Sequence, residues 1–91
     1  MKTVQSIDRA FSLLEEITRK PAGISDLARS VDLPTSTVAR LLYTLEDLGA
    51  IVRTADDTTY QIGPALLTMA TTVDPTQSLL AVAQPHLLDL V

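Results

Sequence analysis

The sequence predicts a mainly helical fold with one small β-hairpin. Apolar residues recur at helical spacing in three segments between residues 6 and 48, and only Asp32 and Leu33 separate the second segment from the third. Two short β-branched segments follow between residues 51 and 62. Three helices followed by a hairpin are the arrangement of a winged helix-turn-helix.

The first predicted helix runs from Ser6 to Arg19. Ser6 is the expected N-cap, and the proline and glycine within residues 21–23 are expected to end the helix. Ile24 could add a brief strand beside the later hairpin. The apolar positions that predict the helix are Ile7, Ala10, Phe11, Leu14 and Ile17.

Residues 25–48 predict the helix-turn-helix itself. A short helix capped by Ser25 leads through the turn to a second helix, which has Pro34 in its first turn and Gly49 just past its end. The second helix of such a motif enters the major groove of DNA. Its expected buried face consists of Val38, Leu41, Leu42, Leu45 and Leu48.

The opposite face of this second helix carries the candidate DNA contacts. Arg40 is its only cation and could contact a guanine edge or a phosphate, or could form an ion pair with Asp47 or another acid. Ser36 and Thr37 could donate to phosphates or bases, or stabilise the first turn. Tyr43 could donate to a phosphate or serve as half-buried packing.

The predicted hairpin pairs residues 51–54 with residues 58–62 across a turn at 55–57. Arg53 is its only cation and could contact DNA or lie on an ordinary surface. Asp56 and Asp57 at the tip are expected to repel phosphates. Two adjacent acids at a hairpin tip are more typical of a turn than of a metal site.

The chain divides into three predicted parts. Residues 1–63 form the winged helix-turn-helix, residues 64–77 a linker helix and connection, and residues 78–91 the first helix of a truncated ligand-binding, or effector, domain. The apolar side chains of this last part predict self-association. It also contains His86, the only histidine, which lacks the partners that catalysis or metal binding would need.

Composition limits the protein to one small domain or one domain and part of another. The 91 residues carry a net charge of -4, but residues 1–53 contain seven cations and seven acids, so this part is neutral and DNA affinity should be modest. The absence of cysteine excludes disulfides and thiolate metal sites. No apolar run approaches the ~18 residues of a membrane span, so we expect a soluble cytoplasmic protein with no membrane contact.

Four segments carry a resemblance to a known family. They are VQSIDRAFSLLE, ISDLARSVDLPTSTVARLLYTLEDLGAIVR, YQIGPALL and AVAQPHLLDL. In order and spacing the whole chain resembles the N-terminal region of an IclR-family transcriptional regulator. The resemblance implies a dimer or tetramer on a palindromic operator in double-stranded DNA, and control by a small-molecule effector through the missing C-terminal domain.

The resemblance also bears on individual residues. It makes a DNA backbone contact by Arg9 plausible, with an ion pair to an acid such as Asp26 as the alternative. Thr35 stands where members often carry a basic residue, and Thr59 and Gln61 stand at wing positions often held by arginine, which reduces the expected strength of DNA contact. Asp32 replaces a common glycine in the turn, a change that aspartate tolerates because it adopts left-handed backbone angles more readily than most residues.

Two functions remain after these observations. The first is a sequence-specific DNA-binding transcriptional regulator, with repression favoured over activation, whose candidate contacts are Arg9, Thr35, Ser36, Thr37, Arg40, Tyr43 and Arg53. The alternative is a winged-helix protein-protein interaction module without DNA binding, which the negative net charge favours. An enzyme is not expected, because the chain shows no catalytic set, phosphate loop, metal ligands or cofactor motif.

Overall fold

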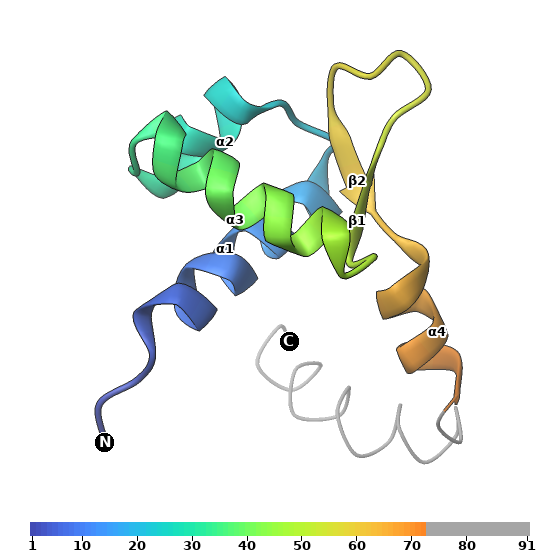
Figure 1. Cartoon of the computed structure of the whole chain (residues 1–91), viewed down its shortest axis with the longest axis horizontal. Coiled ribbons are helices and arrows are strands. Elements are labelled where there is room, and N and C mark those ends of the chain that lie inside the picture. The colour runs from blue at the N-terminus through green and yellow to red at the C-terminus, as the bar shows by residue number, and fades with distance from the viewer. Residues whose placement is uncertain (73–91) are drawn as a thin grey trace, which may run out of the picture.

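The computed structural model describes residues 1–72 and has the predicted winged helix-turn-helix architecture (Figure 1). Its elements, in chain order, are α1 (Gln5–Arg19), α2 (Ile24–Val31), α3 (Thr35–Asp47), β1 (Ile51–Arg53), β2 (Tyr60–Ile62) and α4 (Pro64–Thr72). The mainly helical fold class, the antiparallel hairpin and a helix after it are therefore confirmed over these residues, whereas the linker role of α4 stays a prediction. The predicted helix at residues 78–91, with His86, lies outside the described part of the chain.

The first two helices begin earlier than the sequence predicted. α1 begins at Gln5, because the amide of Asp8 already donates to the carbonyl oxygen of Val4 at 3.1 Å, so Ser6 lies inside the helix and is not its N-cap. α2 begins at Ile24, and the amide of Leu27 donates to the carbonyl oxygen of Gly23 at 3.0 Å.

Ser25 and Ile24 therefore have other roles than those predicted. Ser25 is a first-turn residue of α2 and not its cap, and Ile24 is helical and adds no strand. The contact with the hairpin comes from Ala22 instead, whose carbonyl oxygen accepts a hydrogen bond from the amide of Tyr60 at 2.9 Å. A single residue next to a helix start can do this because its carbonyl is not used within the helix.

The turn between α2 and α3 depends on a left-handed aspartate. Asp32 has φ 55° and ψ 52°, which confirms that aspartate adopts the left-handed angles this turn requires. Pro34 has extended ψ of 146° and its carbonyl oxygen accepts from the amide of Val38 at 3.1 Å. Pro34 is thus the residue before α3, whereas the sequence predicted it within the first turn.

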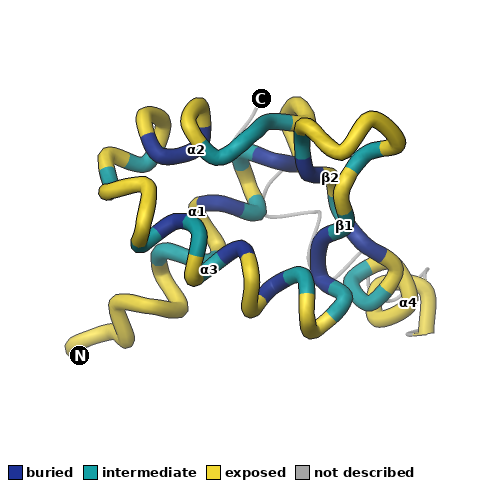
Figure 2. The backbone as a smooth tube through the Cα atoms, turned by 45° about the horizontal axis from the view of Figure 1, so that its top comes forward, coloured by how far each residue is buried: buried dark blue, intermediate teal, exposed yellow. Residues whose placement is uncertain are grey.

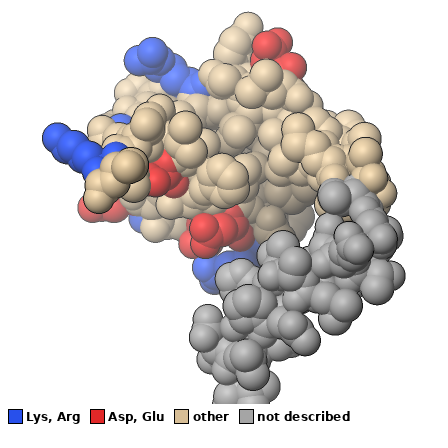
Figure 3. All heavy atoms as spheres, turned by 90° about the horizontal axis from the view of Figure 1, so that it is seen from below, with Lys and Arg blue, Asp and Glu red and all other residues tan. Residues whose placement is uncertain are grey.

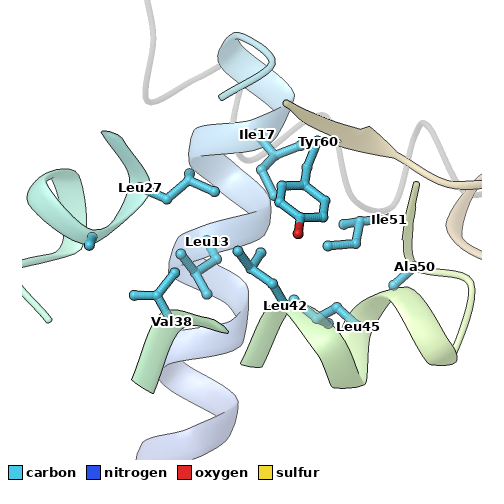
Figure 4. Packing of buried hydrophobic residues seen from close by; sticks show 10 residues of the cluster. Leu13, Ile17, Leu27, Val38, Leu42, Leu45, Ala50, Ile51 and Tyr60 are labelled. Atoms are coloured by element: carbon cyan, nitrogen blue, oxygen red, sulfur yellow. The ribbon is translucent and has the colours of Figure 1, made fainter. Parts of the chain in front are cut away.

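The core lies where α1, α2, α3 and the hairpin meet (Figure 4). Three large apolar residues that were expected to be buried are instead exposed: Ile7 by 57%, Phe11 by 61% and Leu48 by 67%. Leu13 is fully buried in place of Phe11. The buried residues are Leu13, Ile17, Leu27, Ala28, Val38, Leu42, Leu45, Ala50, Ile51 and Tyr60.

The differences in α1 and α3 have separate physical causes. α1 packs through Ala10, Leu13, Leu14 and Ile17, a second set of residues at helical spacing, so its N-terminal half extends beyond the core (Figure 2). Leu48 follows the last turn of α3, where the chain leaves the helix axis toward the hairpin.

Two glycines fix the junction between α3, the hairpin and α4. Gly49 has φ 78°, which confirms the predicted left-handed position after α3. At Gly63 a Cβ atom would collide with the carbonyl oxygen of Gly49. The amide of Gly63 donates to Ala50 at 2.8 Å and that of Ala65 donates to Gly49 at 3.0 Å, so the start of α4 is held against the end of α3.

Within residues 1–72, the helices are too short or too polar to cross a membrane.

Candidate nucleic-acid interface

α3 presents the face that the sequence predicted for DNA contact. Thr35, Ser36, Arg40 and Tyr43 are exposed, and Thr37 is partly exposed. Tyr43 is 72% exposed, so it is not half-buried packing. The buried side of the helix, with Val38, Leu42 and Leu45, holds α3 to the core and leaves the other side available.

A groove of about 500 Å³ lies beside this face, between the N-terminal half of α1 and α3. It is lined by Ser6, Arg9, Thr37, Ala39, Arg40, Leu41, Tyr43 and Thr44. Four of the seven candidate contacts therefore come together: Arg9, Thr37, Arg40 and Tyr43. Ser36 and Thr35 lie on the same helix, outside the groove lining.

The two arginines of the groove are available for a ligand. Among residues 1–72, neither Arg9 nor Arg40 forms an ion pair, so the alternative pairs with Asp26 and Asp47 are not present. Asp26 pairs with Arg29 instead. The groove thus combines two cationic donors from different helices with hydroxyl groups, which is the chemistry that contacts a phosphate backbone.

Other arginines in the described part of the chain are engaged with acids. Arg19 contacts Glu16 at 2.9 Å, and Arg29 pairs with Asp26, in each case within one helix. On the face seen in Figure 3, basic and acidic side chains lie in small separate groups among uncharged residues. No broad basic surface is visible on that face.

Arg53, the seventh candidate, lies apart from the groove and is surrounded by acids. Its Nε atom is 3.4 Å from Glu46 and its Nη1 atom is 3.5 Å from Asp57. Its guanidinium carbon lies 5.5 Å from the centre of the Tyr60 ring. Tyr60, Glu46 and Asp57 together raise the pKa of Arg53 above its ordinary value.

Asp56 and Asp57 form hydrogen bonds within the tip of the wing, which is the hairpin of β1 and β2 with the turn between them. These bonds confirm the predicted turn. The amide of Asp57 donates to the carbonyl oxygen of Thr54 at 2.8 Å, and Asp57 has φ 63°. The carboxylate of Asp56 accepts from the hydroxyl of Thr54 at 2.7 Å and from the hydroxyl and amide of Thr58 at 2.8 and 3.3 Å. These hydrogen bonds lower the pKa of Asp56.

The two other wing positions discussed above have different surroundings. Thr59 shares a hydrogen bond between hydroxyls with Thr54 at 3.0 Å, so it serves the hairpin. Gln61 is exposed in the middle of β2.

Four residues of the groove were not among the predicted contacts: Ser6, Ala39, Leu41 and Thr44. Leu41 was expected on the buried face of its helix but is partly exposed and lines the groove. Periodicity assigns each residue to a face of its own helix but does not say which faces of two helices lie side by side. The only available signal was the spacing of Ser6 and Arg9, which puts them one turn apart on α1.

Comparison with known proteins identifies this fold. The family model described as the IclR helix-turn-helix domain matches residues 6–55, more than half of the chain. This chain belongs to the IclR family. The resemblance seen in the sequence is thereby confirmed, and with it the fold of a DNA-binding helix-turn-helix regulator.

One curated relative and several solved structures are similar to this IclR-family chain. The HTH-type transcriptional regulator Rv1719 of Mycobacterium tuberculosis is 38% identical over 72 residues, which are 77% of this chain and 28% of the relative. An IclR homolog from Microbacterium sp. strain HM58-2 aligns with a TM-score of 0.74 and 28% identity over 89% of this chain and 34% of that protein. The repressor BlcR of Agobacterium tumefaciens aligns with a TM-score of 0.68 and 30% identity over 98% and 38%.

The chain therefore spans between 28% and 38% of the length of these three proteins. The relatives are described as transcriptional regulators and not as enzymes.

Proposed function

We propose that this IclR-family domain binds double-stranded DNA in a sequence-specific way, with α3 in the major groove. The observation that supports this most directly is the pair of arginines, Arg9 and Arg40, that line one groove beside the exposed face of α3 without an acidic partner in residues 1–72. A helix in the major groove contacts bases with its N-terminal residues, while its neighbours contact the backbone.

The candidate contacts divide by their position. Thr35, Ser36 and Arg40 on the exposed side of α3 are the proposed base contacts, since arginine can bridge the edge of a guanine with two donors. Arg9 on α1 and Thr37 and Tyr43 on α3 are the proposed phosphate contacts, because they line the groove beside α3 and offer donors.

We further propose that two copies bind a palindromic operator. Ile7 and Phe11 on α1, with Val4 just before the helix, form an exposed apolar stripe, and Leu67 and Met69 are exposed on α4. Apolar patches of this kind mark interfaces. Two-fold pairing of the protein would match a two-fold symmetric DNA site.

Family membership supports the remaining parts of the proposal. Residues 1–63 form the DNA-binding domain, residues 64–77 connect it, and residues 78–91 begin an effector domain that responds to a small molecule in the cytoplasm. We favour repression over activation, because one similar protein, BlcR, is described as a repressor.

Selection of bound duplexes from a random pool tests this function. We expect the selected sequences to share a palindrome with at least one guanine in each half, and Arg40→Ala to lose that preference. Sedimentation should show concentration-dependent self-association that Phe11→Ser weakens. Recovery of duplexes with no common sequence would contradict the proposal.

The net charge of -4 favours one competing function, a winged helix that binds a protein and not DNA. In that case the parent protein would not retain any duplex at low salt, where non-specific contacts to phosphates are strongest.

A further inference from the structure

Arg53 contacts three parts of the molecule at once. It lies in β1, and its contacts are Glu46 in the last turn of α3, Asp57 at the wing tip and the ring of Tyr60 in β2. Tyr60 is buried, and its amide donates to Ala22 at 2.9 Å. One side chain therefore connects the end of α3 and the tip of the wing over an aromatic ring anchored in the core.

The form of these contacts depends on a guanidinium group. Nε of Arg53 faces Glu46, whereas Nη1 faces Asp57, so two different nitrogens serve two carboxylates. The planar group also lies over Tyr60, where a cation is attracted by the face of the ring. A lysine has a single nitrogen on a flexible stem and cannot reproduce all three contacts.

The same contacts make Arg53 a poor phosphate ligand. A phosphate that approached this side chain would meet one positive charge and two carboxylates, and it would have to displace at least one of them. Arg9 and Arg40 meet no such competition within residues 1–72. The three arginines are thus chemically alike but differ in availability.

We propose that Arg53 is a positioning residue, which sets the wing against α3 and does not itself contact DNA. The proposal rests on the DNA-binding function proposed above. In this proposal Arg53 affects DNA binding indirectly. By fixing the wing, it determines how closely β1 and β2 approach the DNA backbone beside α3.

Two substitutions at Arg53 separate positioning from phosphate contact. Arg53→Lys keeps the charge and loses the bridge, whereas Arg53→Gln loses both. With a fluorescein-labelled duplex of random sequence at low salt, we expect both variants to weaken binding about threefold, the size of effect that surface ion pairs produce. The dependence of affinity on salt should remain that of the parent.

The acidic partner supplies an independent variant with a matched control. Glu46→Gln removes the carboxylate that holds Arg53, while Asp47→Asn removes its neighbour, which pairs with no arginine or lysine in residues 1–72. Each removes one negative charge near the end of α3. We expect Asp47→Asn to strengthen binding slightly and Glu46→Gln to weaken it, and Glu46→Gln to add nothing in an Arg53→Gln background.

Exchange of the hairpin amides tests positioning without DNA. The amide of Thr54 donates to Thr59 at 2.9 Å and that of Asp57 donates to Thr54 at 2.8 Å. Both should exchange faster in Arg53→Lys and Glu46→Gln, and no faster in Asp47→Asn. Unchanged exchange in Arg53→Lys would overturn the proposal even if the parent protein bound no DNA.

Other results contradict the proposal in the binding experiment. If Arg53→Lys binds as tightly as the parent while Arg53→Gln weakens binding and lowers the salt slope by about one, Arg53 contacts a phosphate. If Arg53→Gln is no weaker than Arg19→Gln, which removes one positive charge that pairs with Glu16 within α1, Arg53 has no role. Failure of the parent to bind any duplex would instead reject the proposed function.

Discussion

The groove beside α3 and the wing both carry arginine, yet they differ in what that arginine can do. Arg9 on α1 and Arg40 on α3 line the same groove, and neither forms an ion pair within residues 1–72. In the wing, Arg53 is shared between two carboxylates. The comparison shows that tertiary contacts determine which arginines of residues 1–72 are paired with acids and which are not.

The difference follows from the positions of the acidic residues in α3. Arg40 lies in the first half of the helix, while Glu46 and Asp47 lie in its last turn. Because the chain reverses at Gly49, the last turn of α3 is adjacent to the wing, and Glu46 reaches Arg53. The acidic end of the helix therefore faces the wing, and Arg40, nearer the other end, forms no ion pair with any residue of 1–72.

The largest expected effect comes from a substitution in the hydrophobic core on which both regions depend. Leu42 is 1% exposed and Leu48 is 67% exposed, although the same sequence pattern predicted both to be buried. Leu42→Ala should cost about 2 to 5 kcal/mol of unfolding free energy, and Leu48→Ala no more than about 0.5 kcal/mol. Urea unfolding measures both, and equal losses would mean that Leu48 is covered by something beyond residues 1–72.

A second substitution should disturb the junction between the two regions. Gly63→Ala puts a Cβ atom against the carbonyl oxygen of Gly49, so the hairpin and α4 must shift relative to the end of α3. We expect a loss of about 1 to 3 kcal/mol in unfolding free energy, the usual cost of overpacking. Gln61→Ala, at an exposed position in β2, is the control and should change little. A Gly63→Ala variant as stable as the parent would show that the junction is not tightly held.

Arg40→Ala should have the largest effect on DNA binding. If Arg40 contacts a guanine, the loss is about tenfold or more on the selected operator, since such a contact discriminates by ~1 to 3 kcal/mol. It should exceed the loss for Arg53→Gln, while Arg19→Ala serves as the control for removal of one charge. Loss confined to one base pair would identify a base contact, and uniform loss with a smaller salt slope a phosphate contact. Equal effects at Arg40 and Arg53 would remove the contrast between the two regions.

The elements were predictable from the sequence because each has a local cause. Helical spacing marks α2 and α3, Asp32 and Gly49 adopt the left-handed angles expected of them, and the turn at residues 55–57 precedes a second strand. These signals arise between residues close in the chain, so they survive without knowledge of the tertiary structure.

The choice between equivalent apolar faces was not predictable. α1 carries two sets of apolar residues at helical spacing, and only packing against α2, α3 and β2 selects Leu13 over Phe11. The state of Arg53 was hidden for a similar reason, because Glu46 lies in a different element and meets it only after the chain reverses at Gly49.

Arg9 allows a finer test of the groove. It lies on α1, beside α3, so its proposed contact is with the backbone and should not depend on sequence. Arg9→Gln should weaken binding to selected and random duplexes by the same factor, about threefold, and lower the salt slope by about one. Lys20→Gln, at the exposed end of α1, is the control. A loss restricted to the selected operator would instead make Arg9 a base contact.

The smallest expected effect concerns Asp56, which tests whether the acids of the wing serve its own structure. Hydrogen bonds from Thr54 and then from Thr58 favour the carboxylate, so the pKa of Asp56 in the folded protein lies below its unfolded value. The resulting stabilisation is fully present above that unfolded pKa and is lost as pH falls through the lower folded pKa.

A carboxyl carbon titration by NMR measures this shift directly. Thr54→Val removes the first of these donors, the hydroxyl at 2.7 Å, and should raise the pKa of Asp56 toward its ordinary value, whereas Thr71→Val, whose hydroxyl bonds only within α4, should not. Asp56→Asn keeps an acceptor for the turn but removes the charge. If the acid serves the turn and also repels phosphates, this variant should keep the hairpin and bind all duplexes slightly more tightly. Loss of the hairpin in Asp56→Asn would show that the turn needs the negative charge itself. The acidic residues would then stabilise the wing by more than their contacts with Arg53.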